Sequence, residues 1–246
     1  MIVKSYYIII LLYILCFSFR VLSLGRLEFI ACIAALIVNG ASLLFIYLST
    51  GHFPGFNVFE SFLFMTFILG LLGVFLKGPK DYADKIRLWV WLDILILLGL
   101  TLFFPKEPAF SMYNYGYIYI ILFYIFRYAS LSLMLYSSAY YVQFIIQREK
   151  DERTRLLSQQ GRNFLVLSAV IFLMSEYVGI IWCQKGWGDF WMWGMTFFQS
   201  TFIVLYLMLA FHIPGKAKSS EDIKAVFGGL AGFAVLTLTI VRSLLG

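Results

Sequence analysis

The sequence is poor in charged residues, cysteine and histidine. Only 13% of its 246 residues are charged and 62% are hydrophobic, whereas a soluble globular domain has about 25% charged residues. So few charged side chains do not cover a water-facing surface, which excludes a soluble globular protein. The three cysteines, Cys16, Cys32 and Cys183, form no Cys-x-x-Cys motif, so thiol–disulfide chemistry is not expected.

The net charge is +6, but the basic residues lie between hydrophobic runs and form no patch, which argues against a nucleic-acid partner. What the sequence does contain is long apolar runs, each close to the roughly 20 residues that span a bilayer as a helix. They predict an all-α fold, a polytopic transmembrane bundle of about eight spans that forms a single domain over residues 1–246. The expected spans are Val3–Phe19, Leu27–Leu48, Phe59–Leu76, Leu88–Phe104, Tyr117–Ile146, Phe164–Trp182, Met195–Phe211 and Ala225–Leu245.

The lysines and arginines are distributed unevenly between the two ends of these spans. Fourteen lie in the connections after the first, third, fifth and seventh spans, four lie at the opposite ends, and Arg127 lies within a span. Basic connections stay in the cytoplasm, so both termini are expected outside. The polar segment Gln147–Arg162 is expected to extend the Tyr117–Ile146 helix into the cytoplasm.

Four of the six tryptophans lie in Trp182–Gly194, expected as an outer interfacial segment. Trp187 and Trp191 are four residues apart and share a face on a helix, while Trp193 points elsewhere. The segment is either an aromatic belt at the membrane interface or a platform for a planar apolar ligand such as porphyrin.

A second outer connection, Gly51–Ser61, contains His52, one of only two histidines. Within it, Asn57 is expected to cap the following span, and Glu60 to occupy its first turn, where the helix dipole favours an acid. The other histidine, His212, follows the Met195–Phe211 run at its cytoplasmic end. A histidine there is either an ordinary interfacial residue or an axial ligand to haem iron.

Three charged residues fall inside spans, where they usually face a partner in the bundle. Arg127 and Glu176 both lie in the outer half, so they either pair with each other or leave Arg127 for an acidic ligand group such as a haem propionate. Asp93 lies nearer the cytoplasmic side, and no partner is predicted for it.

The run Gly51-His52-Phe53-Pro54, followed by Asn57, Phe59, Glu60 and Ser61, resembles the outer-loop motif of the CcsA-type (system II) cytochrome c assembly proteins. The Trp182–Trp193 segment is similar to the tryptophan-rich segment of that family. The spacing from Trp187 to His212 also matches a family histidine within the bundle.

This resemblance implies haem handling in the biogenesis of c-type cytochromes, in a bacterial inner membrane. It implies non-covalent haem b, held by the tryptophans Trp187, Trp191 and Trp193 and ligated by histidines, with His212 as the iron ligand of an inner site. His52 is a candidate outer ligand and Arg127 a candidate propionate partner. The implied partners are haem, a CcsB-like or other membrane subunit, and an apocytochrome c. An enzymatic role would be limited to a component of a haem-attachment complex.

The sequence departs from the family pattern at the outer site. Gly194 stands where the family has Asp after the last tryptophan, and Arg127 where it has an outer histidine; the chain stops at Gly246, before a second outer histidine. These departures leave two further readings open. One is a non-catalytic membrane subunit of a respiratory or electron-transfer complex that retains the fold, and the other is a regulator of haem synthesis.

Overall fold

The computed structural model describes residues 2–76, 78–79, 81–108, 118–147, 152–188, 195–213 and 220–245, and the regular structure in those ranges is entirely helical. This confirms the all-α fold class. The helices are α1 (Ile2–Val21), α2 (Gly25–Thr50), α3 (Val58–Phe75), α4 (Ala83–Thr101), α5 (Ile118–Ile146), α6 (Glu152–Trp187), α7 (Met195–His212) and α8 (Ser220–Leu245).

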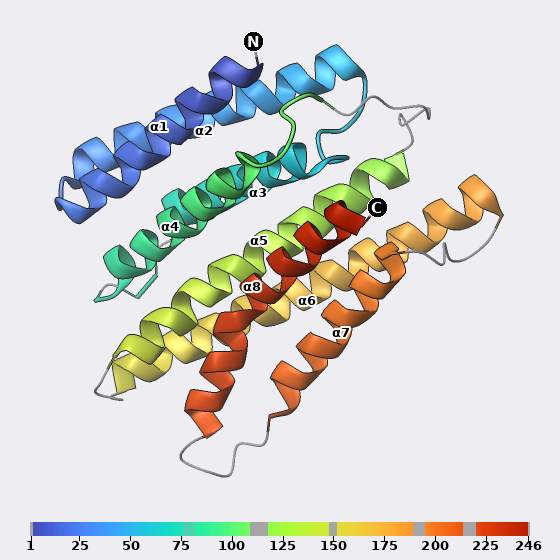
Figure 1. The fold of residues 1–246 in the computed structure, drawn as a ribbon. Coiled ribbons are helices and arrows are strands. Elements are labelled where there is room, and N and C mark those ends of the chain that lie inside the picture. Colours follow the sequence, from blue (N-terminus) through green and yellow to red (C-terminus); the bar gives the residue numbers. More distant parts are fainter. Residues whose placement is uncertain are drawn as a thin grey trace. The chain divides into compact units, whose positions relative to one another are not determined.

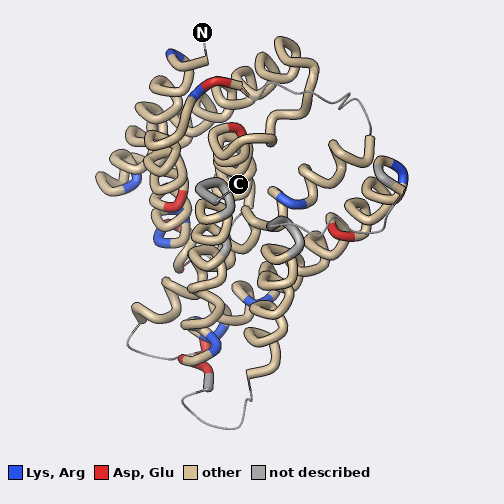
Figure 2. The backbone as a smooth tube through the Cα atoms, turned by 45° about the vertical axis from the view of Figure 1, so that its right-hand side comes forward, with Lys and Arg blue, Asp and Glu red and all other residues tan. Residues whose placement is uncertain are grey.

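Within the described residues, six helices are long and apolar enough to cross a bilayer: α1, α2, α3, α5, α6 and α8. Helix α4 falls outside this group because four charged residues, among them Asp93, lie in its 19 residues. The apolar stretch described for α7, Phe198–His212, is shorter than a full span. Charged residues are sparse along the chain (Figure 2). Composition and helix length together identify an integral membrane protein.

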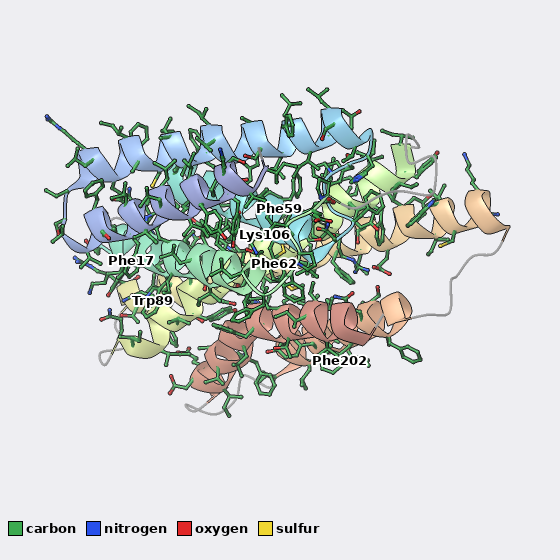
Figure 3. All side chains as sticks on the ribbon, turned by 45° about the horizontal axis from the view of Figure 1, so that its top comes forward. Phe17, Phe59, Phe62, Trp89, Lys106 and Phe202 are labelled. Carbon is green, nitrogen blue, oxygen red and sulfur yellow. The ribbon has the colours of Figure 1, made fainter. Side chains whose placement is uncertain are left out.

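The chain divides into two compact units, Met1–Tyr117 and Ile118–Gly246. In the first unit α1 packs against α2 and α4, and α3 packs against α2 and α4 (Figure 1). Only three residues separate α1 from α2, so the two helices form an antiparallel hairpin. The core of this unit includes Phe59 and Phe62, both fully buried (Figure 3).

In the second unit α5 packs against α6 and α8, and α7 packs mainly against α8. Small residues let the helices approach closely, as is common between membrane helices. A Cβ atom added at Gly228 of α8 would lie 2.2 Å from the ring of Tyr141 on α5. Serines add hydrogen bonds between α5 and α6: the Ser130 hydroxyl donates to the Ser168 carbonyl at 2.9 Å, and the Ser168 hydroxyl donates to the Ser130 carbonyl at 3.0 Å.

The polar segment expected to extend α5 belongs instead to the next helix. Helix α5 ends at Ile146, and Glu152–Arg162 forms the first three turns of α6. With 36 residues, α6 is about 54 Å long, much longer than the roughly 30 Å hydrocarbon core of a bilayer. The helical nature of the segment was predicted correctly, but its assignment to the preceding span was wrong.

Candidate functional site

The loop between α2 and α3 is built around the two ends that it joins. Gly51 ends α2 in a left-handed conformation (φ 73°), and its amide donates to the Tyr47 carbonyl. At the start of α3 the Asn57 side chain accepts the Glu60 amide at 2.8 Å. The predicted cap is thus confirmed. The Asn57 amide nitrogen also donates to the Glu107 carbonyl at 2.9 Å, which ties the loop to the segment after α4.

Glu60 occupies the first turn of α3, as predicted, and is completely buried. Its Oε2 accepts hydrogen bonds from the amides of Gly55 and Phe56, each at 2.9 Å. A carboxylate that accepts two backbone amides in a buried site stabilises the loop strongly. Glu60 therefore fixes the path of the chain through this loop in addition to complementing the helix dipole.

His52 lies buried inside the same loop. Its Nδ1 lies 3.0 Å from the Phe53 carbonyl oxygen, and its ring meets the Phe56 ring edge to face at 5.0 Å. Because a carbonyl only accepts, Nδ1 carries the proton and Nε2 the lone pair of the neutral imidazole. The ring is held in a defined orientation by its own loop.

Lys106 lies after α4, on the same unit as this loop (Figure 3). Its ammonium group is 5.7 Å from the centre of the Tyr6 ring and donates to the carbonyls of Leu102 and Phe104. The Tyr6 hydroxyl in turn bonds the Thr101 side chain and donates to the Leu98 carbonyl. Lys106 therefore caps the end of α4 rather than facing a ligand.

Arg127 and Glu176 form an ion pair inside the second unit, with Nη1 and Oε1 separated by 2.8 Å. Ser200 on α7 completes the network: its hydroxyl accepts from Arg127 Nη2 at 2.7 Å and donates to Glu176 Oε1 at 3.0 Å. The predicted pairing is confirmed, and the same contacts connect α5, α6 and α7. The sequence did not indicate Ser200, because one serine in an apolar run carries no recognisable signal.

Two phenylalanine rings enclose the guanidinium of Arg127. Its Cζ lies 4.6 Å from the centre of the Phe172 ring and 5.2 Å from that of Phe123. Cation–π contacts of this kind strengthen when water is excluded. Arg127 thus has a carboxylate, a hydroxyl and two aromatic faces around it, and a haem propionate would have to compete with Glu176 to reach it.

His212 is the last residue of α7 and its side chain is exposed. Its Nδ1 lies 2.8 Å from the Met208 carbonyl, one turn back along the helix. Nδ1 is therefore the protonated nitrogen, and Nε2 has no hydrogen-bond partner in the part of the chain that the structure describes. Histidines that bind metals commonly donate their second nitrogen to a carbonyl in this way.

The tryptophan-rich segment begins as a helix rather than as a loop. Trp182 lies in the last turns of α6, where its ring is 5.7 Å from that of Phe123. The helix ends at Trp187, because Gly188 adopts a left-handed conformation (φ 76°). One continuous helix carrying Trp187 and Trp191 on a shared face is therefore not present. The side chain of Trp187, and Trp191 and Trp193 altogether, lie outside the described residues.

Two acidic residues complete the set of charges inside the helices. Asp93 lies near the middle of α4 and is partly exposed; among the described residues it has no hydrogen-bond or ion-pair partner. Glu28, which the sequence reading missed, is buried at the start of α2. It pairs with Arg20 at 3.0 Å and accepts the Trp91 indole N–H at 2.9 Å. A basic and an acidic residue on either side of the short connection after the first span were the available signal.

A metal held only by protein groups would need several ligands together. Within the described ranges no three or more His, Cys, Asp or Glu side chains are gathered to hold one. Haem iron has a lower requirement, because the porphyrin supplies four nitrogens and the protein one or two axial ligands. The exposed imidazole of His212, with Nε2 unprotonated, fits one such ligand.

Comparison with known proteins does not assign the chain to a group: no family model matches it, and no curated protein matches it.

Proposed function

We propose that this protein handles haem in the biogenesis of c-type cytochromes, as a divergent relative of the CcsA-type assembly proteins that presents haem on the outer face of a bacterial inner membrane. The observation that carries the proposal is His212. Its Nδ1 proton is bound to the Met208 carbonyl, which leaves Nε2 to bind iron. The likeness of the Gly51–Ser61 and Trp182–Trp193 segments to the family motifs supplies the direction of the proposal.

The proposed arrangement has eight spans with both termini outside, so that α4 and α7 also cross the membrane. Its support is the uneven distribution of lysine and arginine, with 14 of the 19 on one side. In this arrangement the tryptophan-rich segment and the His52 loop lie outside, and His212 lies at the cytoplasmic end of α7.

The proposed cofactor is non-covalent haem b, whose iron would supply redox chemistry when bound. His212 would hold the iron. The segment with Trp187, Trp191 and Trp193 would offer aromatic surface on the outer face, and His52 is the other histidine available there. The proposed partners are a CcsB-like or other membrane subunit and an apocytochrome c.

These residues do not act on a single haem. Trp187 and His212 are 25 residues apart, at most about 37 Å along a helix, and the whole of α7 lies between them. We therefore propose at most one well-ligated haem, at the cytoplasmic half of the protein, and an outer site that is filled only transiently.

The test is the reduced-minus-oxidised visible spectrum of the purified protein, with pyridine haemochrome quantitation. His212→Ala is expected to abolish the haem spectrum, because it removes the proposed iron ligand. His52→Ala is the matched control and is expected to keep it, as is Trp191→Ala. An unchanged spectrum in His212→Ala, or loss of haem only in His52→Ala, would refute the His212 assignment. Absence of haem in the wild-type protein would refute haem storage by this chain.

A second candidate function is a non-catalytic membrane subunit of a respiratory or electron-transfer complex. The observation in its favour is the closed network of Arg127, Glu176 and Ser200, because Arg127 stands where the family has an outer iron ligand and is already engaged. Deletion of the gene separates the two candidates. Loss of covalent haem from the c-type cytochromes supports the assembly role, whereas normal cytochromes with an impaired oxidase or dehydrogenase support the subunit role.

A further inference from the structure

The α1–α2 hairpin has a register that brings two cysteines together. Arg20 Nη1 and Glu28 Oε2 are 3.0 Å apart, which pairs these two residues across the antiparallel helices. One turn further from the connection, α1 carries Cys16 and α2 carries Cys32. Since both helices have the same rise per turn, the same register sets Cys16 opposite Cys32.

The side chains follow this register. Cys16 and Cys32 are both completely buried, and their thiols lie in hydrogen-bonding contact with one another. Cys32 is flanked on the buried side of α2 by Ala31 and Ala35. These methyl-sized side chains leave room for the helix backbones to approach closely, as a disulfide between two helices requires. Figure 3 labels the neighbouring residue, Phe17, on α1.

We propose that Cys16 and Cys32 form a dithiol site that a small uncharged oxidant, of the class of hydrogen peroxide, converts to a disulfide joining α1 to α2. The absence of a Cys-x-x-Cys motif is no obstacle, since the two thiols come from different helices. The third cysteine, Cys183, lies on α6 in the other unit and is a natural internal comparison.

The chemistry uses one peroxide and both thiols. The sulfur of one cysteine attacks a peroxide oxygen, the O–O bond breaks, and a sulfenic acid and one water result. The sulfur of the second cysteine then attacks the sulfenic sulfur, the S–S bond forms and a second water leaves. Two electrons pass from the sulfurs to the peroxide. Burial restricts the site to oxidants that penetrate packed apolar helices, so a bulky charged disulfide such as oxidised glutathione should not react.

The experiment uses the full-length protein in detergent with Cys183→Ser, leaving two cysteines. It is treated with hydrogen peroxide, unfolded, and labelled with a maleimide–polyethylene glycol that shifts each free thiol on a gel. Two labels are expected before treatment, none after it, and two again after dithiothreitol. A trypsin digest without reductant should contain the Cys16 and Cys32 peptides joined, with the loss of two hydrogens. Cys16→Ser and Cys32→Ser, in the same background, should each keep one reactive thiol.

Three outcomes would overturn the proposal. The first is that both thiols still take the label after peroxide. The second is that either sulfur is found as a sulfinic or sulfonic acid without the joined peptides. The third is that the disulfide links two chains. Equal oxidation by oxidised glutathione would contradict the restriction to small uncharged oxidants. None of these results depends on haem binding.

Discussion

Arg127 shows how a single charged side chain is accommodated among apolar helices. Its guanidinium contacts Glu176, Ser200 and the faces of two phenylalanine rings. Each polar atom of the network is satisfied mainly by the others, because water is excluded from this site. The energetic consequence is that the members of the network depend on one another.

Removing either charged partner should therefore destabilise the protein strongly. Arg127→Ala and Glu176→Ala are each expected to lower the free energy of unfolding by about 3–5 kcal/mol, because each leaves one buried charge unpaired. The double variant should lose less than the sum of the two. The measurement is reversible unfolding of the purified protein in mixed detergent micelles. Strictly additive losses would show that the two charges are energetically independent.

Asp93 raises the opposite question at the scale of the helix. It lies near the middle of α4, the charged helix that is not among the six most apolar, and no described side chain pairs with it. A carboxylate at the centre of a membrane helix costs about 2.5–3.5 kcal/mol of insertion free energy. Helix α4 should accordingly insert poorly when it is separated from its neighbours.

Asp93→Leu is expected to make isolated α4 insert more favourably by about 3 kcal/mol, since it removes that cost. The measurement is the inserted fraction of the α4 segment in a glycosylation-mapping assay with microsomes. Asp84→Leu is the matched control. Its effect should be smaller, because Asp84 lies in the first turn of α4 and near the interface. Equal effects of the two substitutions would contradict a central position for Asp93 in the bilayer.

Helix α8 owes its position to two adjacent glycines that face different surroundings. A Cβ at Gly228 would lie 2.2 Å from the Tyr141 ring, whereas a Cβ at Gly229 would have its nearest contact at 3.7 Å. The first distance requires α8 to move away from α5, and the second is an ordinary van der Waals contact. The two positions therefore test the close approach of the helices with the same chemical change.

Gly228→Ala is expected to destabilise the protein by about 1–3 kcal/mol through overpacking against α5. Gly229→Ala should be neutral or stabilising by up to about 1 kcal/mol, because alanine favours the helix. Thermal unfolding of the two purified variants measures both effects. A loss of equal size at Gly229 would indicate that general backbone changes, rather than the contact with Tyr141, control this helix pair.

The whole molecule is organised with respect to the membrane by its basic residues. With 14 of 19 lysines and arginines in alternate connections, a reporter fused after Gly246 should be active outside, and one inserted within Gln147–Arg162 should be active in the cytoplasm. Alkaline phosphatase and green fluorescent protein fusions at both sites measure this, each serving as the control for the other. Reporters that place the two sites on the same side would refute the eight-span arrangement.

The sequence by itself determined the features that depend on neighbours along the chain. Apolar runs near bilayer length predicted the helices, because a helix satisfies its own backbone in lipid. Asn57 and Glu60 predicted the start of α3, since a cap acts over three residues. The Arg127–Glu176 pair was also predictable, because two opposite charges at similar depth in an apolar bundle have few other partners.

Only the tertiary structure decided which side chains meet between helices. It assigned Glu152–Arg162 to α6, brought Ser200 to the Arg127–Glu176 pair, and set Cys16 against Cys32. A polar helical segment has the same local preference whether it ends one helix or begins the next. Contacts between helices depend on their rotation and register, which small residues such as Gly228 fix through packing. Periodicity along the sequence reports which face is apolar, but the partner of each residue on that face is chosen by close packing in three dimensions.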